Sequence, residues 1–130
     1  MKAILAVIRP EKFRDVKDGL HNEGVHMMTV LDVRGCGQQK GYTKEYRGVI
    51  EEVKLHRKVM LLIAVNKSFV EKAIKTIVRS ARTGKIGDGK IFVLPLEDCI
   101  RISSGETGVG AIGGSSDELR KLKQMAIIEI

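Results

Sequence analysis

The order of apolar segments along the chain constrains the fold more than any other feature of the sequence. Residues 3–8 form a continuous apolar run that ends at Arg9-Pro10, where proline stops a strand and favours the first turn of a helix. The helix carries an apolar stripe and reaches a glycine stop at Gly24, and residues 28–34 are rich in β-branched side chains. The first third of the chain therefore predicts strand, helix, strand.

The same order recurs later in the chain. Residues 59–65 predict a third strand, and Ser68 with Glu71 three residues later has the spacing of a capping box at the start of a helix that ends at Gly84. Residues 90–94, closed by Pro95, predict a fourth strand, and residues 100–102 a short extended segment. The helix face is apolar at 3–4 residue spacing: Phe69, Ala73, Ile74, Ile77 and Ala81.

Two βαβ units of similar length predict an α+β fold of the ferredoxin-like βαββαβ class, with four antiparallel strands and both helices on one face of the sheet. The other face of the sheet is then left open. Since its strands are apolar, we expect self-association to cover it.

A long segment between the two units, residues 35–57, shows neither helical nor strand periodicity. It holds four glycines and many charged side chains. Loops of this length in small domains usually carry function, so the segment predicts a functional loop.

Length and composition exclude several classes of protein. The chain has 130 residues, enough for one domain, and a formal net charge of +7 without a strongly basic block. Its apolar runs are too short to cross a membrane, and charges interrupt the N-terminal run as they would not in a signal peptide. Two cysteines are too few for a disulfide framework, so we expect reduced thiols and a cytoplasmic location. Two tyrosines, three phenylalanines and no tryptophan disfavour base stacking, so binding of nucleic acid is the less favoured alternative.

Two segments are candidates for ligand binding. Residues 83–90 hold three glycines with Lys85 and Lys90, so the turn is either structural or able to bring main-chain N–H groups close to a phosphate. The spacing is not that of a P-loop. Arg101, between two isoleucines, forms either a surface ion pair or an anion clamp.

Catalytic constellations are missing. His21, His26 and His56 lack the spacing of a metal site with acidic partners, and each is expected to be solvated or satisfied within the fold. Cys36 lies among glycines and basic residues, but no motif supports a thiol nucleophile, so an enzyme using Cys36 is the weakest alternative.

At this point the sequence resembles a known family. Residues 83–93, TGKIGDGKIFV, resemble the C-terminal signature of the nitrogen-regulatory PII signal-transduction proteins. Residues 35–41 and 46–48 resemble the base and body of that family's T-loop, here residues 36–57. The segment around Arg101, with Gly105-Glu106 and Ala111-Ile112, resembles its C-loop. The resemblance covers residues 1–112 and leaves residues 113–130 as a C-terminal extension.

The resemblance implies a non-enzymatic cytoplasmic regulator that forms a homotrimer, senses ATP or ADP, and binds 2-oxoglutarate beside Mg-ATP. It implies target proteins such as an ammonium channel or enzymes of nitrogen metabolism, gripped through the T-loop, and no insertion into the membrane. The nucleotide contacts it implies are Thr29, Gly37, Gln38, Gln39, Ala64, Gly87, Asp88, Gly89, Lys90 and Arg101. The implied 2-oxoglutarate set is Gln39, Gly41, Lys58, Ile86 and Gly87, with Gln39 also a ligand of Mg²⁺.

Several positions depart from the family pattern. Glu51 stands where uridylylated members carry a tyrosine, and Val49 where some relatives carry a phosphorylated serine, so both switches are expected to be absent. Ser103 replaces an arginine that pairs with Arg101 on the phosphates, and Gln38 stands at a position that is often basic. A specialised regulator of nitrogenase or of carbon assimilation is therefore an alternative within the family.

Overall fold

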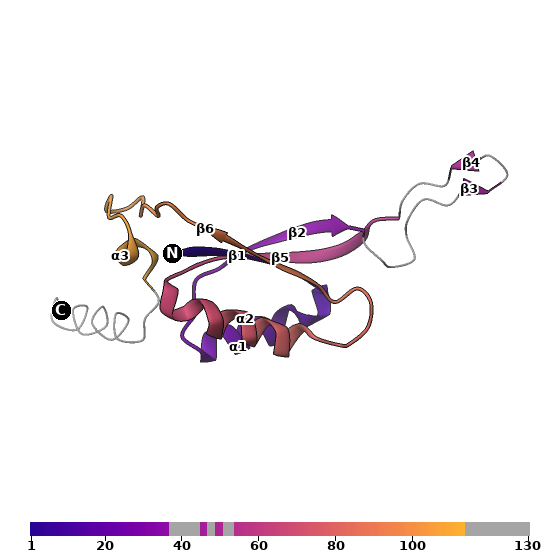
Figure 1. Cartoon of the computed structure of the whole chain (residues 1–130), viewed down its shortest axis with the longest axis horizontal. Coiled ribbons are helices and arrows are strands. Elements are labelled where there is room, and N and C mark those ends of the chain that lie inside the picture. The colour runs from indigo at the N-terminus through magenta and orange to yellow at the C-terminus, as the bar shows by residue number, and fades with distance from the viewer. Residues whose placement is uncertain (37–44, 47–48, 51–53, 114–130) are drawn as a thin grey trace.

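The computed structural model describes residues 1–36, 45–46, 49–50 and 54–113. Its main sheet has the strand order β2-β5-β1-β6, and each neighbouring pair is antiparallel. The two long helices cover the same face of this sheet (Figure 1). The predicted ferredoxin-like α+β fold is therefore confirmed. The elements are β1 (Lys2–Ile8), α1 (Phe13–Asn22), β2 (Thr29–Gly35), β5 (His56–Val65), α2 (Lys67–Ala81) and β6 (Gly89–Pro95).

The core lies between the sheet and the helices. Ile4, Ala6 and Ile8 alternate along β1 and are buried, each opposite a buried residue of β5. Val16 and Leu20 of α1, one turn apart, close this layer from the helix side, together with Ala73 and Ile77 of α2. Burial of each large side chain contributes about 1.5–3 kcal/mol, so the alternation along the strands decides which face the helices cover.

The helix ends differ in detail from the prediction. Pro10–Lys12 form a short 3-10 turn before α1, and α2 begins at Lys67 with Asn66 as its N-cap. The capping box on Ser68 is therefore wrong, because Asn66 already holds the extended backbone of the cap and Ser68 lies inside the first turn. The helix also ends at Ala81 and not at Gly84, since the N–H groups of Thr83 and Gly84 are taken by a side chain further along.

The predicted loop contains more regular structure than its sequence indicates. The pairing of β2 with β5 extends to Gly35 and His56, so β5 begins before residue 59. Within the loop, β3 (Glu45–Tyr46) pairs with β4 (Val49–Ile50) as a separate two-stranded sheet. Strands of two residues are too short to show a period, which is why the sequence did not predict them. Residues 37–44, 47–48 and 51–53 lie outside the described part.

The sheet face away from the helices is apolar and open in the single chain, as predicted. Leu5 of β1 lies between Leu62 of β5 and Phe92 of β6, and these three side chains share that face. Leu62 is 40% exposed and Phe92 is 51% exposed. Leu31 and Leu94 extend the patch along the outer strands.

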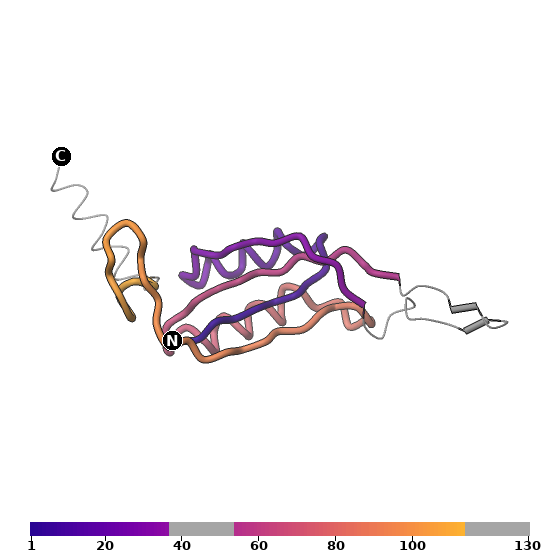
Figure 2. Tube along the Cα trace, turned by 90° about the horizontal axis from the view of Figure 1, so that it is seen from above, coloured from indigo at the N-terminus to yellow at the C-terminus, as the bar shows by residue number. Residues whose placement is uncertain are grey.

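The C-terminal segment only partly follows the prediction of an extended stretch. Ile100 pairs with Thr107 in an isolated bridge, and residues 102–104 turn. The turn is closed by Arg101 N–H donating to the Glu106 carbonyl (2.8 Å), which brings the chain into the short helix α3 (Val109–Ile112), not predicted from the sequence. Figure 2 shows this segment, in orange and yellow, at the opposite end of the molecule from the ends of β2 and β5 that lead into the T-loop. None of the helices in the described ranges could span a membrane.

Candidate functional site

The glycine-rich turn, residues 83–89, leads from α2 to the first residue of β6 and is built around the carboxylate of Asp88. The N–H groups of Thr83 and Gly84 donate to Oδ2 at 2.9 and 2.8 Å, and the Thr83 hydroxyl donates to Oδ1. These bonds fold the turn back on itself immediately after the helix. The resemblance made Asp88 a nucleotide contact, whereas its carboxylate here is engaged by its own turn.

Arg9 fastens the glycine-rich turn to the sheet. Its Nε donates to Asp88 Oδ1 at 3.0 Å and its Nη2 donates to the Ile86 carbonyl at 2.8 Å. Pro10 ends β1, so Arg9 lies where the strand leaves the sheet. Arg9 was not predicted from the sequence, because its partners are 77 and 79 positions away and no motif links them.

The ionisation of Asp88 follows from these contacts. Hydrogen bonds from the Thr83 hydroxyl and the Thr83 N–H, with Arg9 and the Gly84 N–H, hold the pKa of the Asp88 carboxyl far below its usual range. The group is therefore an obligate acceptor, and it stabilises the turn as a carboxylate.

Lys58 reaches the same turn from β5. Its Nζ donates to the Gly87 carbonyl, and the residue is buried. Burial lowers the pKa of the Lys58 ammonium, and the nearby Arg9 charge lowers the pKa further. An ammonium has three donors, so Lys58 can hold Gly87 and still donate to a carboxylate of a ligand.

The glycines of the turn permit a close approach of two chain segments. Gly89 has φ +100°, and a Cβ there would lie 1.7 Å from the Val7 carbonyl oxygen. No residue other than glycine fits this contact with β1. Gly84, with φ +84°, has open space around it.

The long connection between β2 and β5, which the resemblance makes the T-loop, begins and ends at this end of the sheet. Lys58 is opposite Val33, two positions before the end of β2 at Gly35, and Gly89 is opposite Ile8. Lys58, Ile86, Gly87, Asp88, Gly89 and Lys90 are therefore brought together next to the strands that enter and leave the loop. Gly37, Gln38, Gln39 and Gly41 lie outside the described residues, so the structure does not test their part of the expected site.

The remaining expected nucleotide contacts are at the other end of the sheet (Figure 1). Ala64 is opposite Ala3, and Thr29 is the first residue of β2. Ala64 follows Lys58 by six positions in β5, which is about 20 Å along a strand. Arg101 follows β6 at this same end. One chain therefore does not bring the two groups of residues into one site.

Arg101 turns toward its own chain. Its Nη2 donates to the Ala111 carbonyl at 3.3 Å, and its Nε lies 4.0 Å from Glu106 Oε2. Within the described part, Nε is buried without a hydrogen-bond acceptor. Of the two interpretations of Arg101, the structure shows an ion pair, with Glu106. The anion clamp stays a prediction.

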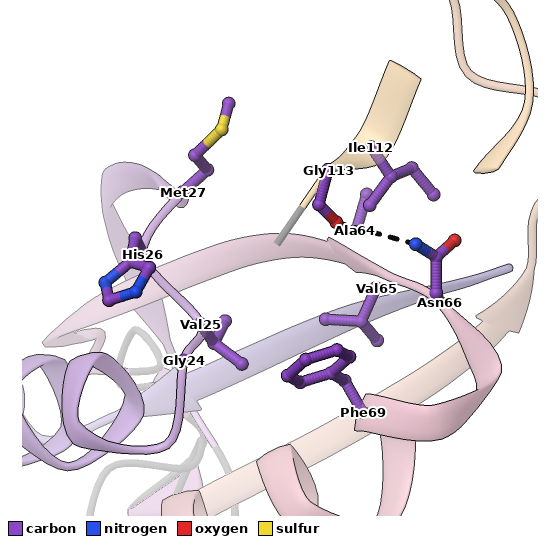
Figure 3. Close-up of a pocket in the computed structure, with 10 residues that line it drawn as sticks. All are labelled: Gly24, Val25, His26, Met27, Ala64, Val65, Asn66, Phe69, Ile112 and Gly113. Atoms are coloured by element: carbon purple, nitrogen blue, oxygen red, sulfur yellow. Dashed lines mark hydrogen bonds between the residues drawn. The ribbon is translucent and has the colours of Figure 1, made fainter. Parts of the chain in front are cut away.

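A small, mainly apolar pocket lies beside Ala64. Figure 3 shows it between the loop that enters β2, the end of β5, the first turn of α2 and the C-terminal end of α3. Asn66 bounds it by donating from Nδ2 to the carbonyls of Val109 (3.3 Å) and Gly113 (3.5 Å). The lining residues are Gly24, Val25, His26, Met27, Ala64, Val65, Asn66, Phe69, Ile112 and Gly113.

The histidines and cysteines are arranged as follows. His21 and His26, each expected to be solvated or satisfied within the fold, lie with their Nδ1 atoms 2.7 Å apart. His56 is half-buried, and its Nε2 has no hydrogen-bond partner in the described part. Cys36 is exposed and Cys99 half-buried, and neither forms a disulfide.

Together, the sheet order, the two helices on one face and the extended connection between β2 and β5 define a ferredoxin-like α+β protein with a long inserted loop. The sequence model of the family described as Nitrogen regulatory protein P-II matches residues 1–106. The chain belongs to this family, whose members are signal-transduction regulators and not enzymes.

Individual relatives agree with this assignment. The chain is 47% identical over 112 residues to Nitrogen regulatory protein P-II 2 of Methanothermobacter thermautotrophicus, covering 86% of this chain and 97% of that protein. It is 46% identical over 112 residues to Nitrogen regulatory protein P-II of Azospirillum brasilense, covering 86% of this chain and 100% of that protein. Among solved structures, Arabidopsis thaliana PII bound to citrate matches with a TM-score of 0.70 and 41% identity, covering 85% of this chain and 90% of that chain.

Proposed function

We propose that this protein senses ATP or ADP together with 2-oxoglutarate and passes the signal to a target protein through its T-loop. The observation that carries the proposal is the contact of Lys58 with the Gly87 carbonyl, which joins the glycine-rich turn to the strand that leaves the T-loop. A ligand that binds Lys58 or the turn therefore acts directly on the base of that loop.

The nucleotide site proposed here is shared between two chains. Gly87, Gly89 and Lys90 would come from one chain, and Thr29, Ala64 and Arg101 from the opposite end of its neighbour. The open apolar face of Leu62 and its neighbours supports an assembly that brings those ends together, and we propose a homotrimer. A monomer would offer only two separated halves.

The proposed 2-oxoglutarate site uses charge and main-chain donors from the Lys58 end. The Lys58 ammonium would neutralise one carboxylate, and the backbone at Ile86-Gly87 would lie beside it. Gln39 would supply an amide oxygen, a hard ligand suited to Mg²⁺, with Gly41 completing the set. The Arabidopsis relative is bound to citrate in its solved structure, which supports a carboxylate as the ligand class.

The output would be a shift in population between states of the T-loop, because an effector changes partner affinity only when it binds one state better than another. Glu51 replaces the tyrosine that a uridylylated relative would use, so occupancy by small molecules would be the main input. The target would be a protein such as an ammonium channel or an enzyme of nitrogen metabolism in the cytoplasm. Glu51 and residues 113–130 favour, as the second candidate, a specialised regulator of nitrogenase or carbon assimilation.

Calorimetric titration tests this function. The purified protein is titrated with ADP and ATP, and then with 2-oxoglutarate in the presence and absence of Mg-ATP. We expect nucleotide binding in the micromolar range and heat from 2-oxoglutarate only with Mg-ATP. Glutarate is the matched control, since it has both carboxylates but lacks the 2-oxo oxygen that helps to chelate a metal. Absence of heat from both nucleotides would contradict the proposal.

A further inference from the structure

Two histidines close the loop between α1 and β2. His21 lies in the last turn of α1 and His26 five residues later, and their rings meet edge to face with centres 4.2 Å apart. The two Nδ1 atoms are 2.7 Å apart, so one nitrogen donates and the other accepts in the metal-free protein. Both side chains are exposed, so the rings can adjust without disturbing the core.

We propose that His21 and His26 form a binding site for a divalent transition metal of the copper class. Neutral imidazole is a preferred ligand of such ions, and two imidazole nitrogens this close can bind one ion when the proton between them is lost and the rings turn toward it. Within the described residues, no group of three His, Cys, Asp or Glu side chains gathers in this way, so the site would have two protein nitrogens with water completing the coordination.

The nitrogens must move apart to hold a metal, because the 2.7 Å between them is the length of a hydrogen bond. Two nitrogens bound at 2.0–2.1 Å are about 3.3 Å apart around a tetrahedral ion, and about 2.9 Å apart when they are adjacent ligands of a square-planar ion. The square-planar arrangement needs the smaller movement. Copper(II) favours this geometry and also stands above zinc in intrinsic affinity, so Cu²⁺ is expected to bind more tightly than Zn²⁺.

The surface beside the two rings has room for the ion and its waters. A hollow of about 140 Å³ is lined by both histidines and by Phe13, Lys17, Val25, Met28 and Val30. A water molecule occupies about 30 Å³ in the liquid, so the hollow holds several. The ammonium of Lys17, on the same hollow, opposes a cation.

The experiment uses the full-length protein with Cys36→Ser and Cys99→Ser, which removes both thiols as competing ligands. Cu²⁺ alone is titrated calorimetrically at pH 7.5, and the bound ion is examined by electron paramagnetic resonance. We expect one tight ion per chain with two imidazole nitrogens in the spectrum, and Zn²⁺ bound at least about tenfold more weakly.

Variants separate this site from unspecific binding. His21→Ala and His26→Ala should each weaken Cu²⁺ binding by about tenfold or more, with unchanged circular dichroism. Lys17 lines the same hollow but is not a ligand, so Lys17→Gln should leave the affinity for Cu²⁺ unchanged or increase it. Equal affinity of the parent and the two histidine variants, or a spectrum with fewer than two imidazole nitrogens, would overturn the proposal.

Discussion

The guanidinium of Arg9 and the carboxylate of Asp88 meet at 3.0 Å and join the end of β1 to the glycine-rich turn. Asp88 also accepts from Thr83 and Gly84, so one carboxylate organises both the exit of α2 and the contact with the sheet. This arrangement fixes the turn whose Gly87 carbonyl accepts from Lys58, and it makes the turn sensitive to the charge of a single side chain.

The first prediction concerns that charge. Because the folded protein lowers the pKa of Asp88, the carboxylate form is stabilised by folding, and its contribution is fully present above the usual carboxyl pKa of about 3.9. The contribution is lost progressively as pH falls below that value. Asp88→Asn removes it at every pH, so the parent and variant urea midpoints should differ most near pH 7 and converge in acid. A difference that grows toward low pH would contradict this assignment.

The second prediction compares two glycines of the turn. Gly89→Ala forces a Cβ against the Val7 carbonyl and should lower the free energy of unfolding by about 3 kcal/mol or more. Gly84→Ala is the matched control, because it has a similar positive φ but open space, and it should cost only about 1 kcal/mol. Thermal and urea unfolding measure both. Equal losses would mean that backbone strain, and not the close approach to β1, decides the cost.

The third prediction tests Lys58 as the counter-charge of the effector. Lys58→Met should weaken binding of 2-oxoglutarate to the Mg-ATP-loaded protein by about 10–100-fold, the value of a charge-assisted hydrogen bond. The control is Lys85→Met, an exposed lysine of the same turn, which should change affinity by less than about threefold. Calorimetry gives both affinities, and similar effects of the two substitutions would remove Lys58 from the site.

The fourth prediction concerns the open sheet face. Leu62→Glu places a charge in the centre of the apolar patch and should convert the proposed trimer to monomers in sedimentation equilibrium. Val78→Glu on α2 is the control, because Val78 is 47% exposed but lies on a helix, away from the open face. Retention of the trimer in Leu62→Glu would show that another surface holds the subunits together.

The fold could be predicted from the sequence because the apolar patterns of its strands and helices each extend over many residues. Residues 3–8 and 59–65 are continuous apolar runs of strand length, and the helical stripe at Phe69, Ala73 and Ile77 extends over more than two turns. The strands and helices of the two βαβ units were therefore correctly predicted. Capping was less predictable, since Asn66 and Ser68 are both good caps and only the tertiary contacts of Asn66 with Val109 and Gly113 distinguish them.

The candidate site could be predicted from the sequence only in part. The residues 83–90 motif located the turn, but sequence alone could not identify Arg9 or the engagement of Asp88 by Thr83, because these depend on segments that meet only in the fold. The pairing of His21 with His26 was missed likewise. A spacing of five is not a helical repeat, and the two rings meet only because the chain turns back after α1.

The separation of Lys58 from Ala64 along β5 has a genetic consequence. If each site is shared between neighbouring chains, a chain defective at its Lys58 end still offers an intact Thr29–Ala64–Arg101 end to its neighbour. Co-expression of one allele mutated at the Lys58 end and another mutated at the Thr29–Ala64–Arg101 end would then restore a fraction of working sites. Neither allele would do so alone. Mutant copies can therefore complement one another because the length of β5 keeps the two halves of a shared site at opposite ends of each chain.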